Sequence, residues 1–564
     1  MNSRLRSVWR SAVGGVVAIG PMVLFGSCGN DVDCSASRTC VSSDAGGQAA
    51  AGAPLTNGVA GVNGGGGDSI GGADAGGSSL SAAGTGEGGQ GGDASGCAGD
   101  VPDDPTCWTT NGRGVFVSSE HGDDAKGDGT KEKPFMTIEK GVATAAGKNV
   151  YVCLGMTTDS YAERVLLDRA ADGVRIYGGF DCEDWSYSQT RKATVASPDT
   201  IALRIVSVKR GVHIENMRFI AADGEGTDVS SYGAFITDSM NVVLRNVELR
   251  AGAGLKGADG DPGTKGDDGA LPGIEQKGLP ALCGGTPPDA DGGSWVPTVC
   301  GSRGGPGGTG VRDSAGGDGF SGIPVSDSTE PPNNQNKGLG ATNTLDDGGD
   351  GIEGADGKRG TPGVAARPLG VFTAAGYTPA DGGDGSAGFS GQGGGGGGAS
   401  RGTPTCRGAS GGAGGMGGCG GLPGHGGRGG GASIGLLSWS SALTLQRCVV
   451  SGGPGGPGGA GGRAGGGGSG GRGGGSGLAD PGNGIGRGGQ GGDGGNGANA
   501  GSGAGGTGGP SFSVVFFGAK PSYTEPDSSL LSEAGGPAGI GGQLPSAKAP
   551  DGLKGASAAM FEVK

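Results

Sequence analysis

The sequence predicts an all-β protein built from stacked coils, and three observations predict it. One segment occurs three times, an amphipathic helix precedes its first copy, and a long glycine-rich run separates its second and third copies. The chain has 564 residues and 145 glycines, while 33% of its residues are hydrophobic and 4% are aromatic. This composition excludes one conventional core for a chain of that length. The apolar residues gather in 114–252, 432–451 and 511–531, so we expect the core to lie there.

The recurring segment is 235–252. Moved back by 30 residues it lies on 205–219, and moved forward by 201 residues it lies without gaps on 436–453. Recurrence of this kind is typical of stacked coils, because each copy buries its apolar face against its neighbours. We expect matched apolar residues to stack as follows: Ile205/Phe235/Leu436, Val206/Ile236/Leu437, Val212/Val242/Leu443, Ile214/Leu244/Leu445, Met217/Val247/Cys448 and Phe219/Leu249/Val450. Asn216 and Asn246 hold one corner of two copies, where asparagine can adopt left-handed backbone, and Arg447 replaces them in the third.

A helix is expected ahead of the coils. A short strand at 115–117 leads through a Gly/Asp turn to Pro134, and apolar residues then follow with helical spacing at Phe135, Ile138, Val142 and Ala145. This stretch resembles the opening of many pectin-lyase-like right-handed parallel β-helices. The resemblance covers about 115–250, and it implies a right-handed parallel β-helix whose first coil is capped by the helix. Short β-branched segments bounded by Gly or Asp predict further strands at 149–153, 164–167 and 173–180, and coils at 201–220 and 231–250.

The N-terminus predicts export. Three arginines (Arg4, Arg6 and Arg10) precede an apolar run of about fifteen residues, which is shorter than the roughly 20 that a transmembrane helix needs. Residues 24–28 look like the lipobox of bacterial lipoproteins, except that Phe25 stands where that family usually has Leu. The resemblance implies lipidation of Cys28, and a plain signal peptide is the alternative. We expect an exported protein that is lipid-anchored to the outer membrane or cell surface of a bacterium.

The other cysteines fit an oxidising compartment. His121, His213 and His425 are scattered and no CxxC pair occurs, so disulfides are favoured over a metal site. We expect the pairs to form between near neighbours, namely Cys34/Cys40, Cys97/Cys107, Cys153/Cys182, Cys283/Cys300 and Cys406/Cys419, with the connectivity left open. Cys448 lies where the other copies have Val247 and Met217, so we expect it to be buried as a small apolar residue.

The expected organisation alternates coils with low-complexity segments. It comprises a signal peptide (1–27), a flexible Gly/Ala/Ser-rich tether (28–106), the cap and coils (107–252), a glycine-rich insertion (253–431), a coil (432–451), a second insertion (452–510), and a terminal coil and tail (511–564). Because the copies at 235 and 436 match without gaps, both insertions should leave one side of the stack.

The glycine-rich insertions allow three interpretations. Glycine recurs at every third residue in 254–269 and in 351–363, which is the spacing of a collagen triple helix. The run 452–462 carries two glycines in every three residues and predicts polyproline-II-like strands packed side by side. Mobile surface loops are the third interpretation. The texture also resembles the repeats of the glycine-rich PE-PGRS surface proteins, whose Pro-Glu N-terminal domain is lacking.

The case for enzymatic activity rests on the resemblance alone. Many pectin-lyase-like β-helices cleave polysaccharides, and they need clustered carboxylates or a calcium site on their coils. The Asp-Asp pairs at 103/104, 123/124, 267/268 and 346/347 lie in turns or insertions, and Gly424-His425-Gly426 lies amid polyglycine. Lys209 and Arg210 lie on a coil without partnering acids. We therefore expect no catalytic residues, with a polysaccharide lyase or glycoside hydrolase as the alternative.

The expected function is that of a non-catalytic surface protein, structural or adhesive. Glycan binding is also open, with Trp185, Tyr187 and Trp439 as stacking platforms. The expected partners are a membrane, reached through the lipid anchor, and surface glycans or other cell-surface proteins. A net charge of −14 argues against nucleic acid. We expect no cofactor, and Asp123, Asp124 and Asp128 are weak calcium candidates.

Overall fold

The computed structural model describes residues 97, 99–154, 160–295, 299–324, 335–524, 526–543 and 548–564. The chain divides into two compact units, Met1–Gly92 and Asp93–Lys564, and all described residues belong to the second. The predicted signal peptide, the lipidation site at Cys28, and Cys34 with Cys40 lie outside the described residues. The tether is predicted to end at residue 106. The described part of the chain begins earlier, at Cys97, which forms a disulfide with Cys107.

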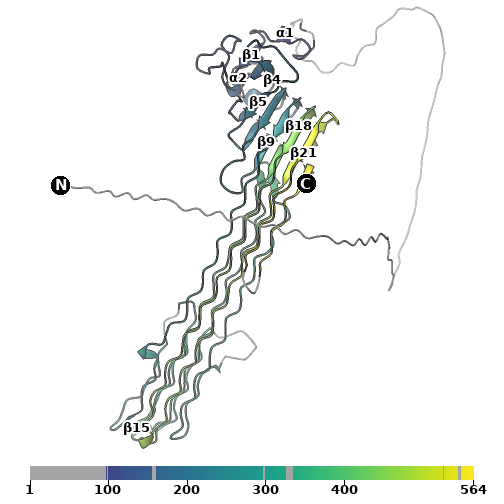
Figure 1. Ribbon diagram of the computed structural model, residues 1–564. Helices are drawn as coiled ribbons and strands as arrows, with labels where there is room; N and C mark the ends of the chain where they lie inside the picture. Colours follow the sequence, from purple (N-terminus) through teal and green to yellow (C-terminus); the bar gives the residue numbers. More distant parts are fainter. Residues whose placement is uncertain are drawn as a thin grey trace, which may run out of the picture. The chain divides into compact units, whose positions relative to one another are not determined.

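The described fold is all-β, with three large parallel sheets and two short α-helices (Figure 1). The first sheet contains β1 (Gly114–Val117), β2 (Asn149–Leu154), β4 (Arg175–Asp181), β7 (Val212–Glu215), β10 (Val242–Arg245), β17 (Leu443–Gln446) and β20 (Ser522–Tyr523). The second contains β5 (Ala193–Ala196), β8 (Met217–Ile220), β11 (Glu248–Arg250), β18 (Val449–Gly452) and β21 (Ser529–Ser532). The third contains β3 (Val165–Leu167), β6 (Ile201–Val206), β9 (Ser231–Thr237), β16 (Ser433–Trp439), β19 (Ser511–Phe517) and β22 (Ser557–Glu562).

Successive coils each contribute one strand to every sheet. The coils are β3–β4–β5, β6–β7–β8, β9–β10–β11, β16–β17–β18 and β19–β20–β21, and each strand pairs in parallel with its counterpart in the next coil. We call these coils the β-stack. Its main core lies between the three sheets, where Ile214, Phe219 and Ile236 are fully buried. The predicted recurrence of one coil is confirmed, and 201 residues separate two coils that are adjacent in space.

The predicted stacking is right for two strands of each coil and wrong for the first. Val212, Val242 and Leu443 lie in register as expected, but Ile205 pairs with Ile236 and Phe235 pairs with Leu437. The reason is the corner between the first two strands, which shortens by one residue at each step, from 207–211 to 238–241 to 440–442. Because a slip of one residue reverses the face of a strand, Phe235 points outward.

Two local predictions near the coils are confirmed. Asn216 and Asn246 have φ angles of 54° and 53°, and the Asn246 amide donates to the Asn216 side-chain oxygen. Helix α2 (Ile138–Thr144) begins at Thr137, whose hydroxyl accepts from the Lys140 N–H. It packs against β1, β2 and β3, and so covers the first coil. The remaining helical elements are α1 (Pro105–Trp108), η1 (Arg169–Ala171), η2 (Ile274–Gln276) and η4 (Pro481–Asn483).

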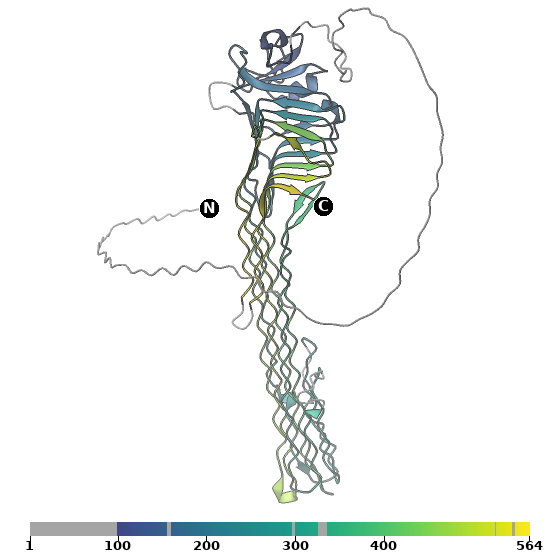
Figure 2. The same ribbon diagram turned by 90° about the vertical axis from the view of Figure 1, so that its right-hand side faces the viewer.

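The glycine-rich insertions form extended segments that lie side by side (Figures 1 and 2). Neighbouring segments are joined by backbone hydrogen bonds at every third residue. For example, the N–H groups of Gly254 and Gly257 donate to the carbonyls of Pro454 and Pro457. A polyproline-II helix has three residues per turn and no internal hydrogen bonds, so it meets each neighbour at one residue in three. We infer that the segments have this conformation, and we call them together the glycine bundle.

The bundle leaves the β-stack at one corner, as predicted. Segments run outward after β11, β18 and β21, and others return to begin β16, β19 and β22. The third excursion, through 533–542 and 549–556, was not predicted. Hairpin β13–β14 (Val371–Thr373 and Gly376–Thr378) lies midway through the first excursion and packs Phe372 and Tyr377 onto the outer face of the third sheet. The pair β12 (Leu282–Cys283) and β15 (Cys406–Arg407) lies at the far end (Figure 1).

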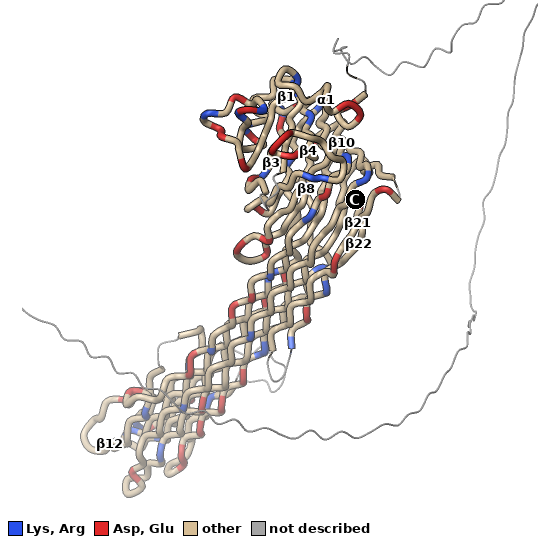
Figure 3. Tube along the Cα trace, turned by 45° about the horizontal axis from the view of Figure 1, so that its top comes forward, with Lys and Arg blue, Asp and Glu red and all other residues tan. Residues whose placement is uncertain are grey.

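Glycine is required where a segment is surrounded. Segment 486–510 has six hydrogen-bonded neighbours, namely 348–363, 380–398, 412–430, 456–477, 536–542 and 550–556. In the run of six glycines at 393–398, a Cβ added to Gly395 would lie 1.7 Å from the carbonyl oxygen of Asn336. Nearer its start, segment 486–510 lacks the last two of its six neighbours and faces solvent, and there every third residue is polar and exposed, at Arg487, Gln490 and Asp493. Figure 3 shows acidic and basic residues distributed along the bundle.

The bundle decides between the three interpretations of the insertions. Segment 254–269 runs parallel to 454–469 but antiparallel to 419–431, whereas a collagen triple helix is parallel throughout. The collagen interpretation is therefore wrong. The mobile-loop interpretation is also wrong for the described residues, because their backbone groups are paired from segment to segment.

Three buried serines join the β-stack to the bundle. The hydroxyl of Ser433 donates to the Gly252 carbonyl (2.6 Å) and accepts from the Gly453 N–H (2.7 Å). Ser231 and Ser511 make the equivalent bonds one coil earlier and one coil later. Each serine therefore links two points of the chain. One is where the chain leaves the serine's own coil, and the other is where it leaves the preceding coil.

Candidate functional site

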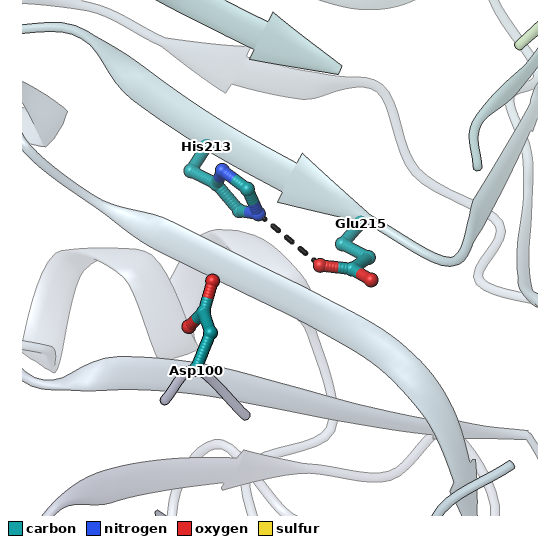
Figure 4. A group of neighbouring side chains, drawn as sticks. All are labelled: Asp100, His213 and Glu215. Atoms are coloured by element: carbon teal, nitrogen blue, oxygen red, sulfur yellow. Dashed lines mark hydrogen bonds and ion pairs between the residues drawn. The ribbon is translucent and has the colours of Figure 1, made fainter. Parts of the chain in front are cut away.

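The described residues contain one cluster with the geometry of a metal or acid–base site, formed by Asp100, His213 and Glu215 (Figure 4). His213 and Glu215 lie on β7, two residues apart, so both point to the outer face of the first sheet. The His213 Nε2 lies 3.2 Å from a carboxylate oxygen of Glu215. Glu215 is only 1% exposed.

Asp100 reaches this face because the N-terminal segment folds over it. The Cys97–Cys107 disulfide closes the segment, and Val101 packs among aromatic side chains of the first sheet. The Tyr177 hydroxyl donates to the Asp100 carboxylate at 2.8 Å. Burial acts to raise the pKa of Asp100, but hydrogen bonds from the Val101 N–H and Tyr177, together with nearby His213 and Arg245, outweigh it and lower the pKa. Asp100 is therefore held in its charged form.

Arg245 decides what this cluster can do. Its guanidinium donates to the Glu215 carboxylate and lies 3.2 Å from Asp100. A metal ion held by the same two carboxylates would have to displace or repel this cation. The cluster is thus a closed ion-pair network that fastens the N-terminal segment to the β-stack. It offers neither a vacant metal site nor a free acid–base pair.

A groove of about 700 Å³ runs along β11 and β18 where the bundle leaves the stack. Asp223, Glu248 and Glu533 line it, so it is the place where carboxylates could act on a bound polysaccharide. Glu248, however, is paired with Arg218 at 2.7 Å, and Asp223 accepts the Ala253 N–H. Among the described residues no metal-binding cluster forms in this groove.

The predicted glycan platforms do not form one site, because Trp185 and Tyr187 pack around Phe180 on the first sheet while Trp439 lies on the third. Trp185 is buried with its ring centroid 4.7 Å from that of Phe116, so it offers no free face. The Tyr187 hydroxyl accepts from the Asn216 amide, and burial raises the pKa of Tyr187 to about 12. Trp439 is half-buried, and Phe517 stacks on one face of its ring at 4.4 Å. Of the three, Tyr187 and Trp439 each keep an exposed part.

The three aspartates named as weak calcium candidates accept hydrogen bonds from nearby backbone N–H groups. Asp123 accepts from the Ala125 and Lys126 N–H groups, and Asp128 accepts from Thr130. Asp124 accepts from the N–H groups that precede helix α2. The three carboxylates are not among the residues that come together with metal-binding geometry in the described structure.

His425, Lys209 and Arg210 likewise lie apart from the Asp100 network. His425 is on the bundle, 3.4 Å from Asp384, in a groove of about 610 Å³ between segments. Lys209 and Arg210 form a corner of the β-stack, where their N–H groups donate to Asp172. These contacts give each residue a structural role.

The described cysteines form four disulfides. The expected pairs Cys97–Cys107 and Cys153–Cys182 are present. The near-neighbour pairing is wrong for the other four, which form Cys283–Cys406 and Cys300–Cys419. The bundle explains the difference, because it places segments that are far apart in the sequence side by side. Cys448 is buried and unpaired as expected, and burial raises the pKa of its thiol.

The Asp100 network was not predicted, although the sequence contains part of the pattern that indicates it. Glu215 and Arg245 are 30 residues apart, at the same place in two copies of the coil, and they pair in register. Opposite charges at one position of stacked copies therefore predict an ion pair between coils. Nothing in the sequence marks Asp100, which comes from outside the repeat.

Comparisons of the chain with family models, with curated proteins and with solved structures found no match. The function is therefore argued from the site and the fold. In the described part of the chain, no helix has the length and apolarity needed to cross a membrane.

Proposed function

We propose that this protein is a non-catalytic, exported surface protein whose glycine bundle presents an adhesive, glycan-binding end outside a bacterial cell. We infer further that the β-stack is a right-handed parallel β-helix of the pectin-lyase-like kind. Lipidation of Cys28, which would anchor the protein to the outer membrane or cell surface, is part of the proposal.

The glycine bundle is the observation that carries the proposal. Its segments are joined by backbone hydrogen bonds along their length and bury few large side chains. Such an arrangement supplies reach and stiffness. The half-exposed ion pairs on its surface, such as Lys256–Asp259 at 2.7 Å, suit contact with water.

The absence of catalytic geometry from the described residues supports a non-catalytic role. A glycoside hydrolase needs two carboxyl groups that face one substrate, one of them protonated. Asp100 and Glu215 are instead neutralised by Arg245, and Glu248 by Arg218. The four disulfides favour an oxidising compartment, as exported proteins require.

The test uses the purified full chain on a glycan microarray and on a panel of soluble polysaccharides. We expect retention of one class of glycan, with no release of reducing ends and no absorbance from unsaturated products. Release of either product would overturn the non-catalytic proposal. Failure to retain any glycan would overturn glycan binding.

The alternative is a polysaccharide lyase or hydrolase that uses the groove along β11 and β18. Its volume and its carboxylates, Glu248 among them, favour this second candidate. If products are released, Glu248→Gln should abolish their release, whereas Glu225→Gln, outside the groove, should not.

A further inference from the structure

Near the far end of the glycine bundle, three large apolar side chains are exposed around one cavity. Leu271, Ile274 and Trp295 are 81%, 84% and 43% exposed. They line a cavity of about 380 Å³ together with Gly273, Glu275, Gln276 and Ser294. This volume lies within the range of small-ligand sites. None of these residues takes part in the Asp100 network or in the groove of the β-stack.

The floor of the cavity is built by Gln276, which is 3% exposed. Gln276 ends the η2 turn, and its side-chain oxygen accepts from the Gly273 N–H. Its backbone carbonyl accepts from Ala413 on a neighbouring segment at 2.8 Å. These bonds fix the orientation of the amide, because only the oxygen can accept from an N–H.

The same amide leaves a donor unused. The Nε2 of Gln276 is buried and has no hydrogen-bond partner in the described structure. A buried donor without an acceptor is costly, and native structures rarely carry one without a reason. Because Gln276 lines the cavity, a ligand oxygen that displaces the side chain covering this nitrogen supplies the acceptor.

Trp295 provides a second feature of a ligand site. The Arg303 guanidinium lies 4.7 Å from the centroid of its ring and so covers one face of the indole. The cation–π contact holds the ring in place at the mouth of the cavity. Ser294, the preceding residue, is fixed by hydrogen bonds to the Glu275 carbonyl. The aromatic surface is therefore preorganised.

The combination of groups selects the ligand class. An apolar ligand would leave the Gln276 donor unpaired and would desolvate the Glu275 carboxylate. An anionic ligand would meet that carboxylate. A neutral hexose offers C–H groups to the indole, a hydroxyl oxygen to Gln276 and a hydroxyl proton to Glu275.

We propose that this cavity binds one neutral hexose residue of a glycan. The proposal rests on the glycan-binding function proposed above and assigns it to the far end of the bundle. It places the contact at Trp295 and not at Trp439 on the β-stack.

The test titrates the full chain with the glycans that a microarray retains. We expect Trp295→Ala to weaken binding at least tenfold. Gln276→Glu keeps the oxygen that accepts from Gly273 but loses the donor, so a similar loss is expected. Phe389→Ala removes another exposed aromatic ring from elsewhere on the bundle and should leave the affinity unchanged. Circular dichroism and disulfide mapping establish that each variant is folded.

The outcomes separate this proposal from the function on which it rests. If the wild type retains glycans and folded Trp295→Ala retains them equally well, the site is wrong while the glycan-binding function stands. Loss of binding in Trp439→Ala alone would likewise move the site to the β-stack. If the wild type retains no glycan, both proposals are overturned.

Discussion

Two arginine–glutamate pairs join the same two coils of the β-stack, and they differ in burial. The Glu215 side chain is 1% exposed and Arg245 reaches it from β10. In the other pair, Arg218 and Glu248 meet at 2.7 Å, but their side chains are 42% and 25% exposed. The pairs are therefore matched in sequence separation and in chemistry, and burial is what separates them.

We expect Arg245→Ala to be much more destabilising than Arg218→Ala. Removal of Arg245 leaves the Glu215 carboxylate buried without its cation, which costs about 3–5 kcal/mol. Removal of Arg218 breaks a partly solvated pair, worth less than about 1 kcal/mol. Urea unfolding followed by circular dichroism measures both. Equal shifts of the two unfolding midpoints would show that the buried network does not fasten the N-terminal segment.

At the scale of the element, the glycine segments depend on the absence of side chains at particular positions. Gly395 lies in a fully surrounded segment, whereas Gly475 lies at a solvent-facing position with no atom within 4 Å of an added Cβ. Both lie in the same kind of backbone. The two positions therefore separate steric packing from the intrinsic effect of replacing glycine.

We expect Gly395→Ala to destabilise the bundle and Gly475→Ala to be close to neutral. The added methyl at 395 would lie 1.7 Å from the Asn336 oxygen, so the segments must move apart and lose hydrogen bonds. The cost should be at least the roughly 1–3 kcal/mol of ordinary overpacking. Thermal unfolding and amide hydrogen exchange of the bundle provide the measurements. Unchanged exchange in Gly395→Ala would refute the tight packing.

Aspartates at the solvent-facing positions cap N–H groups of neighbouring segments. Asp259 accepts from Ala460, and Asp268 accepts from Ser469. Hydrogen bonds from Lys256 and from the Ala460 N–H lower the pKa of Asp259, and those from Lys265 and Ser469 lower the pKa of Asp268. The stabilisation is therefore present above the unfolded-state pKa, about 3.9, and is lost as the pH falls through the lower folded pKa.

We expect the thermal midpoint of the bundle to fall as the pH drops from about 5 to about 2, and to fall less in the double variant Asp259→Asn/Asp268→Asn. Asparagine keeps an oxygen that accepts the N–H but does not titrate in this range. The control is Asp267→Asn, because Asp267 makes no such bond among the described contacts. A pH dependence that is identical in the double variant and in the wild type would contradict this role.

At the scale of the whole unit, two disulfides join segments of the bundle. Cys283–Cys406 and Cys300–Cys419 span 123 and 119 residues, so each constrains a long loop of the unfolded chain. A disulfide of this kind stabilises by about 2–5 kcal/mol. Cys283–Cys406 lies at the end opposite the β-stack, and Cys300–Cys419 lies further in along the bundle, where the Cys419 N–H donates to the Asp267 carbonyl.

Peptide mapping without reduction should recover the pairs 283–406 and 300–419. Reduction should lower the thermal midpoint of the bundle more than that of the β-stack, because the two described disulfides near the stack, Cys97–Cys107 and Cys153–Cys182, close loops of only 10 and 29 residues. Cys300→Ser should reproduce part of that loss. Recovery of peptides linked 283–300 and 406–419 would contradict the arrangement of the segments.

Patterns that repeat locally were predictable from the sequence. The coils at 205–219 and 235–252, the α2 cap and the Asn216–Asn246 corner each follow from spacing within a few residues. The register of the first strand of each coil was not predictable. The corner that follows this strand becomes shorter from coil to coil, and this shifts Phe235 by one residue relative to Ile205. The bundle was offered only as one of three interpretations, since glycine composition does not state how many segments meet. Gln276 and Trp295 carry no sequence signal, because their surroundings come from that assembly.

The three-residue period of the bundle also restricts how its gene can change. A segment keeps its polar residues toward solvent only if it gains or loses whole turns, which are three codons each. The outgoing arm of an excursion pairs along its length with the returning arm, as 456–477 does with 488–509. Lengthening one without the other would leave a row of unpaired peptide groups. Related genes should therefore differ by Gly-Gly-Xaa units added to both arms of an excursion, and single-codon insertions should be confined to the turns at its tip.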